Sequence, residues 1–168
     1  IKIEVTFEKH LQTKILKALF KNHVYEEVAY EIYQLENKHQ NIGLGRVGEF
    51  ENALSETEFL QLVKDKLQCG GIKHSIFTGK GIKKVAVLGG SGSFAIKNAI
   101  HSGADAYLTA DLKYHQFYEA ENQLLLADIG HFESERFTKN YIVDFLKEKI
   151  TNFAIILSEE NTNPVKYF

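Results

Sequence analysis

The second half of the chain alternates short, continuously apolar runs with stretches of helical periodicity. The apolar runs are VAVLGG (85–90), ADAYLTA (104–110), QLLLADIG (123–130) and FAIILS (153–158). Strands that are apolar on both faces are typical of a parallel sheet covered by helices on both sides. The pattern therefore predicts an α/β fold with a mostly parallel sheet and helices on both faces, and residues 153–158 as its last strand.

Residues 1–37 show a different order of patterns, strand then helix then strand. Ile1 to Phe7 alternates apolar and polar side chains, an apolar stripe from Leu11 to Leu19 has helical spacing, and residues 28–35 return to alternation. This βαβ order is typical of one half of a ferredoxin-like domain. We expect its partner half upstream of Ile1, and, because the chain contains no methionine, we expect a fragment of a longer product.

A polar, glycine-bearing stretch follows this unit. We interpret residues 38–53 as a linker and residues 54–168 as a C-terminal α/β unit. The second unit begins with a capping box, formed by Ser55 and Glu58, at the start of a helix. The expected organisation is therefore half of a ferredoxin-like domain, a linker and an α/β unit.

Composition and charge exclude several classes of protein. Lys and Arg number 20 against 22 Asp and Glu, so no single-sign field would attract nucleic acid or an anionic membrane. No apolar stretch is long enough to span a bilayer. Cys69 is the only cysteine, which excludes an intrachain disulfide and fits a reducing compartment. We therefore expect a cytoplasmic protein with neither nucleic acid nor membrane as its partner.

Polar stretches directly follow three of the predicted strands. They are GGSGS (89–93), TADLKYH (109–115) and DIGHFESE (128–135). In parallel α/β sheets, ligands bind in the crevice outside the carboxyl ends of the strands. We therefore expect these three stretches to contribute to one functional site.

The GGSGS stretch allows two interpretations. Small residues and free backbone N–H groups at the start of a helix bind anions such as phosphate. By this interpretation the candidate cofactor-binding residues are Gly90, Ser91, Gly92 and Ser93. The same stretch suits a tight turn in which Ser91 or Ser93 caps the following helix. Both interpretations stay open, because the stretch has neither the P-loop ending nor a full dinucleotide fingerprint.

Asp111 and His115 are candidate catalytic residues within TADLKYH. If Asp111 begins a helix, His115 lies one turn further along the same face, and the pair could transfer protons or ligate a metal. The more common role of an aspartate at such a position is to cap the helix.

His131 and Glu135 are the candidate metal ligands. They stand four residues apart, on one face of the helix that we expect after Gly130. Asp128 and Glu133 offer carboxylates that can hydrogen-bond a ligating imidazole. The alternative is a capping histidine and a solvated glutamate in the first turn. Two protein ligands alone are too few for a tight site.

The segments GSGS, GADAYLTADLKYHQ and GHFESE occur in the order and at the intervals of a known family. With NHVYEEVAYEIYQLEN, GLGRVGEF and the closing SEENTNPVKYF, they make the chain resemble the Ngg-interacting-factor-three-like family, also called GTP cyclohydrolase type 2 homologues. The resemblance extends over essentially the whole chain. It departs at Ala110, where the family usually has glycine, and at Val24 and Val28, which replace prolines.

The resemblance implies a site of two divalent metal ions, such as zinc, iron or manganese, between two similar α/β halves. The GHxxxE motif of the family makes His131 and Glu135 metal ligands, and its GDLKYH motif places Asp111 and His115 in the same pocket. Further ligands of the family, two adjacent histidines and an aspartate, have no counterpart here. Residues 1–37 resemble the second half of an inserted domain similar to the small trimeric signalling proteins.

The resemblance also implies an assembly and an activity. Members of the family resemble ring-shaped hexamers, so we expect a homo-oligomer. The implied function is metal-dependent hydrolysis of a nucleotide or phosphoester, with a nucleotide or phosphate as ligand. The alternative is a non-catalytic metal-binding, metal-delivery or regulatory module whose inserted domain senses a ligand.

Overall fold

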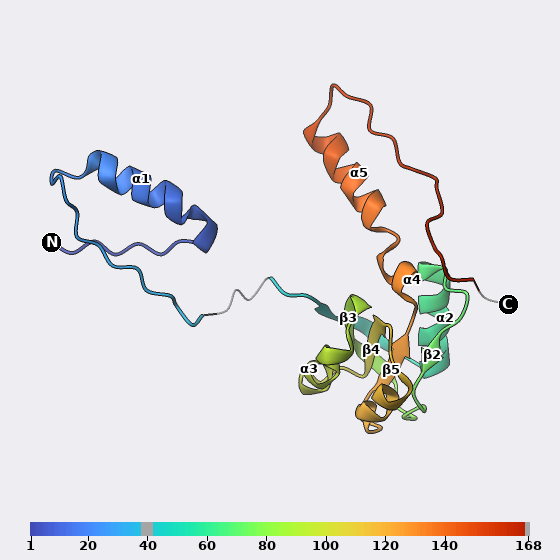
Figure 1. Ribbon diagram of the computed structural model, residues 1–168. Helices are drawn as coiled ribbons and strands as arrows, with labels where there is room; N and C mark the ends of the chain where they lie inside the picture. Colours follow the sequence, from blue (N-terminus) through green and yellow to red (C-terminus); the bar gives the residue numbers. More distant parts are fainter. Residues whose placement is uncertain (38–41, 167–168) are drawn as a thin grey trace. The chain divides into compact units, whose positions relative to one another are not determined.

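The computed structural model describes residues 1–37 and 42–166 (Figure 1). The chain divides into two compact units, Ile1–His39 and Gln40–Phe168. No helix in the described ranges is long and apolar enough to cross a membrane.

The first unit consists of a short 3-10 helix η1 (Lys9–Leu11) and the helix α1 (Gln12–Asn22), flanked by extended segments (Figure 1). The predicted helix is confirmed, but the predictions of strands at 1–7 and 28–35 are wrong. Neither segment forms a strand, and Ile3 and Val5 are exposed rather than half-buried. In a split βαβ unit, the two strands are separated by a strand from elsewhere in the domain. The segments 1–7 and 28–35 therefore do not pair with each other, and neither has a hydrogen-bonding strand within this unit.

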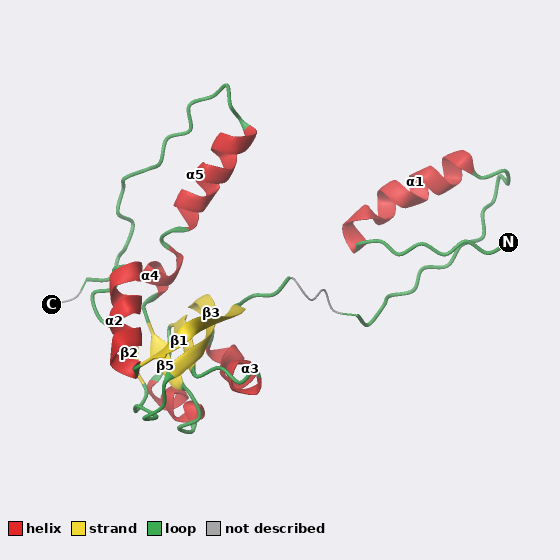
Figure 2. Cartoon of the chain, turned by 180° about the vertical axis from the view of Figure 1, so that it is seen from behind, coloured by secondary structure: helices red, strands yellow, loops and turns green. Residues whose placement is uncertain are grey.

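The second unit is built on a sheet with the strand order β1-β3-β4-β5-β2. Figure 2 shows the strands of this sheet in yellow. Its central strands are parallel, and antiparallel strands form its edges. The α/β prediction with a mostly parallel sheet is confirmed. The strands are β1 (Arg46–Leu54), β2 (Lys73–His74), β3 (Ile82–Ser91), β4 (Ala106–Ala110) and β5 (Leu125–Asp128).

Two expectations about this unit need correction. The interpretation of 38–53 as a linker is wrong for 46–53, which belong to β1; residues 38–41 lie outside the described part. As an edge strand, β1 is mostly exposed, so its polar sequence resembles a loop. The prediction of a strand at 153–158 is also wrong: none of these residues belongs to a strand in the structure, and Phe153 and Ile156 are exposed.

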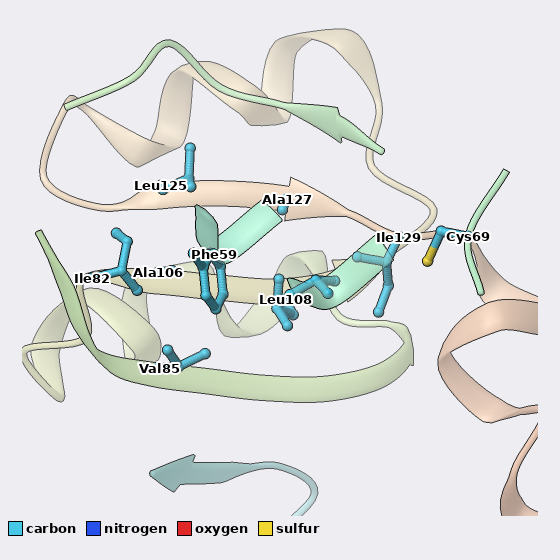
Figure 3. Packing of buried hydrophobic residues seen from close by; sticks show 10 residues of the cluster. Phe59, Cys69, Ile82, Val85, Ala106, Leu108, Leu125, Ala127 and Ile129 are labelled. Atoms are coloured by element: carbon cyan, nitrogen blue, oxygen red, sulfur yellow. The ribbon is translucent and has the colours of Figure 1, made fainter. Parts of the chain in front are cut away.

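Helices cover both faces of the sheet. On one face α2 (Glu56–Leu67) contributes Phe59 and Val63 to a cluster with alternate residues of the central strands. Figure 3 shows Phe59 among these strand residues. On the other face lie η2 (Ser93–Ala95), α3 (Ile96–His101) and η3 (Tyr114–Ala120), which pack against Tyr107 and Leu126. Because successive strand residues point to opposite faces, continuously apolar strands supply two cores.

The start of α2 follows directly from its sequence. The Ser55 hydroxyl accepts a hydrogen bond from the backbone N–H of Glu58, and the Glu58 carboxylate accepts one from the backbone N–H of Ser55. This confirms the predicted capping box. After β5, the chain forms α4 (His131–Glu135) and α5 (Thr138–Lys149), and α5 buries none of its residues within the described structure.

Candidate metal centre

The three polar stretches meet because β3, β4 and β5 are parallel neighbours whose carboxyl ends lie at one edge of the sheet. Ser91 ends β3, Asp111 follows β4, and His131 begins α4 two residues beyond Ile129. The Ser91 hydroxyl donates a hydrogen bond to Asp111 Oδ2. The same oxygen lies 2.6 Å from His131 Nδ1.

His131 and Glu135 lie on one face of α4, as the spacing predicted. His131 Nε2 is 3.4 Å from Glu135 Oε2. The preceding Gly130 has a φ of 88°, a conformation that glycine adopts at low cost, and it turns the chain from β5 into the helix. Both side chains are about half exposed, at 52% and 53%, so a ligand from solvent can reach them.

The glycine stretch after β3 provides clearance for this pair. A Cβ on Gly90 would lie 2.6 Å from Glu135 Oε1 and 3.4 Å from His131 Nε2. The Gly90 N–H donates to Ser134 Oγ at 2.8 Å, which ties β3 to α4. The prediction that Ser91 or Ser93 caps the following helix is wrong, because neither η2 nor α3 has a side-chain cap.

The other two candidate anion-binding residues are Gly92 and Ser93. The Gly92 carbonyl accepts a hydrogen bond from the Tyr107 hydroxyl at 2.8 Å. A Cβ on Gly92 would lie 2.5 Å from that hydroxyl oxygen, so the close approach requires glycine. Ser93 begins η2, and the helix that follows it, α3, has only 6 residues. Close packing therefore explains why glycine occupies positions 90 and 92. Anion binding by residues 90–93 stays a prediction.

The expected pairing of Asp111 and His115 on one helical face is wrong. Asp111 has a φ of 59° and lies outside a helix, since η3 begins only at Tyr114. Aspartate tolerates this left-handed conformation better than most residues. His115 is exposed on η3, and the structure pairs Asp111 with His131 instead.

The expectation that Asp128 and Glu133 hydrogen-bond the imidazole of His131 is wrong, because both carboxylates have other partners. Asp128 is buried, and its carboxylate accepts hydrogen bonds from the backbone N–H groups of Leu112 and Gly130 at 3.0 and 3.1 Å. Lys73 Nζ lies 2.7 Å from the same carboxylate. Glu133 Oε1 accepts a hydrogen bond from Asn163 Nδ2. The carboxylate on the imidazole is therefore Asp111, a contact that sequence reasoning missed because the two residues are far apart in the chain.

Asp111 and His131 shift each other's protonation in opposite directions. Hydrogen bonds from Ser91 and then from His131 lower the pKa of the Asp111 carboxyl, against a smaller opposing effect of burial. The hydrogen bond to Asp111 raises the pKa of the His131 imidazole, which partial desolvation opposes and the charges of Asp111 and Glu135 reinforce. The pair thus favours a carboxylate beside a ring that carries a proton on Nδ1.

This arrangement fits part of a metal centre. Nδ1 faces Asp111 and Nε2 faces Glu135, so the nitrogen and the carboxylate that can bind a metal together are those of His131 Nε2 and Glu135. A histidine that ligates through one nitrogen and donates from the other to a carboxylate is a recurrent arrangement in metal sites. Within the described residues, no group of three or more His, Cys, Asp or Glu side chains could hold a metal. The described part of the chain therefore offers two ligands rather than a full set.

Comparisons with known proteins identify relatives of nearly the whole chain. The family model Duf34/NIF3 (NGG1p interacting factor 3) matches residues 3–164. The GTP cyclohydrolase 1 type 2 homolog of Bacillus subtilis is 37% identical over 99% of this chain and 46% of its own length. The homolog of Listeria innocua is 33% identical over the same shares. The chain thus spans about half the length of the curated relatives that it matches.

Solved structures show the same fold. A Bacillus cereus protein related to NIF3 superposes with a TM-score of 0.74 at 32% identity, covering 96% of this chain and 46% of that one. A Staphylococcus aureus protein superposes with a TM-score of 0.78 at 24% identity, covering 99% of this chain and 55% of that one, and supports the fold alone. Since the family model covers nearly all of the sequence, the chain belongs to the Duf34/NIF3 (NGG1p interacting factor 3) family.

Proposed function

We propose that this chain is part of a protein that binds divalent metal ions through His131 Nε2 and the Glu135 carboxylate. The observation that carries the proposal is the 3.4 Å approach of these two groups on α4. Gly90 supports it, because a Cβ there would lie 2.6 Å from Glu135 Oε1 and would displace that carboxylate. Imidazole and carboxylate together suit zinc, iron or manganese.

We propose two ions per complete protein, with the remaining ligands supplied from outside this chain. Two ligands are fewer than the four that zinc usually takes. The curated relatives are about twice as long, since the match covers 46% of their length. A site completed by other protein is consistent with the half-exposed state of His131 and Glu135.

The activity that we propose is hydrolysis of a nucleotide or phosphoester. When bound, a divalent ion acts as a Lewis acid and makes water a stronger nucleophile. This chain's own residues hold the ligands in place: Asp111 keeps a proton on His131 Nδ1, and Gly130 sets the direction of α4. We retain the exposed imidazole of His115 as a candidate for proton transfer and 90–93 as a candidate phosphate site. The name of the curated relatives, GTP cyclohydrolase 1 type 2 homolog, supports a nucleotide substrate.

The alternative is a metal-delivery or regulatory module without catalysis. The exposure of both ligands is compatible with it, because a half-exposed site can pass an ion to a partner as readily as it can admit a substrate. In that case a small molecule that binds to the first unit would control the release of the metal. Turnover of a nucleotide by the metal-loaded protein separates the two functions: measurable hydrolysis supports the enzyme, and tight metal binding without turnover supports the delivery module.

We further propose a cytoplasmic homo-oligomer, with a hexamer as the expected assembly. Supporting this, the first unit exposes apolar side chains along both extended segments, and α1 buries none of its residues. Extended segments with unsatisfied backbone groups favour pairing with other strands.

Elemental analysis after dialysis tests the metal proposal. Replacing His131 with alanine should reduce the bound metal, whereas His101→Ala should not, because His101 ends α3 and is not part of the pair. A His131→Ala protein that retains its full metal content would overturn the assignment. The comparison requires the complete protein, since this chain by itself should bind metal weakly.

A further inference from the structure

The two ring nitrogens of His131 have different surroundings. Nδ1 lies 2.6 Å from Asp111 Oδ2, a short hydrogen bond of the kind that an ionised partner makes. Nε2 lies 3.4 Å from Glu135 Oε2, outside the usual distance for a charge-assisted bond. The ring is therefore held from one side and is approached more loosely from the other.

We infer that Asp111 is a positioning residue that fixes His131 in the tautomer with the proton on Nδ1, so that the Nε2 lone pair is directed to the metal shared with Glu135. This inference rests on the proposed metal function. An ionised carboxylate only accepts hydrogen bonds, so the nitrogen beside it must be the donor. The neutral ring then has its free lone pair on Nε2.

The structure holds Asp111 in place from several directions. Its Oδ2 accepts a hydrogen bond from the Ser91 hydroxyl in addition to the one from His131. The next residue, Leu112, donates its backbone N–H to the buried Asp128 carboxylate at 3.0 Å. Asp128 also accepts the Gly130 N–H, which immediately precedes His131. The segment carrying Asp111 and the segment carrying His131 are thus attached to the same buried side chain.

This arrangement has a direct consequence at Glu135. With the proton on Nδ1, Nε2 and the Glu135 carboxylate are both electron donors that face each other. A cation bound by both groups would relieve that repulsion. If the proton moved to Nε2, the ring would donate to Glu135 and its ligand position would be blocked. The role of Asp111 is therefore to prevent that competing state.

Nitrogen-15 NMR of the histidine rings in the metal-free protein tests the tautomer directly. At about pH 9, above the ordinary imidazole range, His131 should show one proton-bearing nitrogen, Nδ1, and one bare nitrogen, Nε2. Asp111→Ala should give a mixture or the opposite tautomer, while backbone shifts of the β3–β5 core stay unchanged. Asp111→Asn should largely restore the original tautomer, because its amide oxygen still accepts a hydrogen bond. A His131 ring whose tautomer does not respond to Asp111→Ala would overturn the inference.

Zinc titration followed at the same ring separates this inference from the proposed function. Asp111→Ala should weaken zinc binding by about 10–100-fold, the usual effect of removing such a supporting partner. Glu135→Gln should weaken zinc binding but leave the metal-free tautomer intact, and Glu121→Gln, at the end of η3, should change neither. The titration uses the complete protein. If its parent form binds no zinc, the metal function fails, and the tautomer still decides the role of Asp111. Equal zinc affinity in the parent and Asp111→Ala would contradict the positioning role.

Discussion

Gly90 illustrates how a residue without a side chain contributes to the site. Its φ of 68° lies in the left-handed region, and β3 approaches α4 so closely there that a Cβ would lie 2.6 Å from Glu135 Oε1. The contacted atom is the end of a flexible side chain, so Glu135 can move away. A side chain at position 90 would therefore have two effects. The strained backbone would lower stability, and the displaced Glu135 carboxylate would lower metal affinity.

Gly90→Ala should lower the free energy of unfolding by about 1–2 kcal/mol, the cost of a left-handed alanine, and weaken metal binding at His131 and Glu135. Urea denaturation and metal titration measure the two effects. Gly79→Ala is the matched control, because Gly79 has a φ of 73° and nothing lies within 4 Å of a Cβ there. Unchanged metal affinity in Gly90→Ala would show that the clearance does not matter for the ligands.

Cys69 provides a second prediction at this scale. Its side chain is 5% exposed. Burial raises the pKa of the Cys69 thiol to about 11, and the charge of Glu133 adds to the shift. The reactive thiolate is therefore scarce in the folded protein at about pH 8. Iodoacetamide should label Cys69 slowly in the native protein and rapidly in urea, as mass spectrometry would record. Equally fast labelling in both conditions would contradict the buried position.

At the scale of elements, Asp128 joins the loops that follow β4 and β5. Its buried carboxylate accepts backbone hydrogen bonds from Leu112 and Gly130, and Lys73 of β2 reaches it from the adjacent strand. The positions of Asp111 and His131 thus depend on a residue that contacts neither side chain. Buried N–H groups that lose such an acceptor are costly.

Asp128→Ala should lower the free energy of unfolding by about 2–4 kcal/mol, because two N–H groups lose their acceptor. It should also broaden the NMR signals of the His131 ring, since the turn at Gly130 is no longer held. Lys73→Ala should cost under about 1 kcal/mol, because the lysine is 67% exposed. Chemical denaturation compares the variants, and an equal loss in both would contradict the dominant role of the backbone hydrogen bonds.

At the scale of the whole molecule, the two units differ in what they bury. The sheet unit contains both hydrophobic clusters, whereas no residue of η1 or α1 is buried in the first unit. An isolated helix of 11 residues is marginal in water. We therefore expect the first unit to gain stability from association with other protein.

Light scattering at tens of micromolar should give a mass above the 19.1 kDa of one chain. Hydrogen exchange should show that amides of α1 become more protected as the concentration rises, whereas those of β5 do not change. A mass of one chain at every concentration, with unprotected α1 amides, would contradict the proposed homo-oligomer.

Several features follow from the sequence by itself, because they depend on neighbours in the chain. Continuous apolar runs indicated the central strands, since a strand covered on both faces has no polar side. The capping box of Ser55 and Glu58 and the pairing of His131 with Glu135 arise within one or two helical turns. In each case the interacting groups are at most four residues apart, so the local spacing determines their contact.

Other features were decided only by the tertiary structure. Asp111 and His131 are 20 residues apart, and they meet because β4 and β5 are adjacent and parallel. The requirement for Gly90 arises from the approach of α4. Residues 1–7, 28–35 and 153–158 have strand-like sequences but lack a neighbouring strand in the described structure. The periodicity of a sequence indicates which side chains prefer burial. Strand pairing and the contact between a carboxylate and an imidazole each require a partner, and only the arrangement of distant segments supplies it.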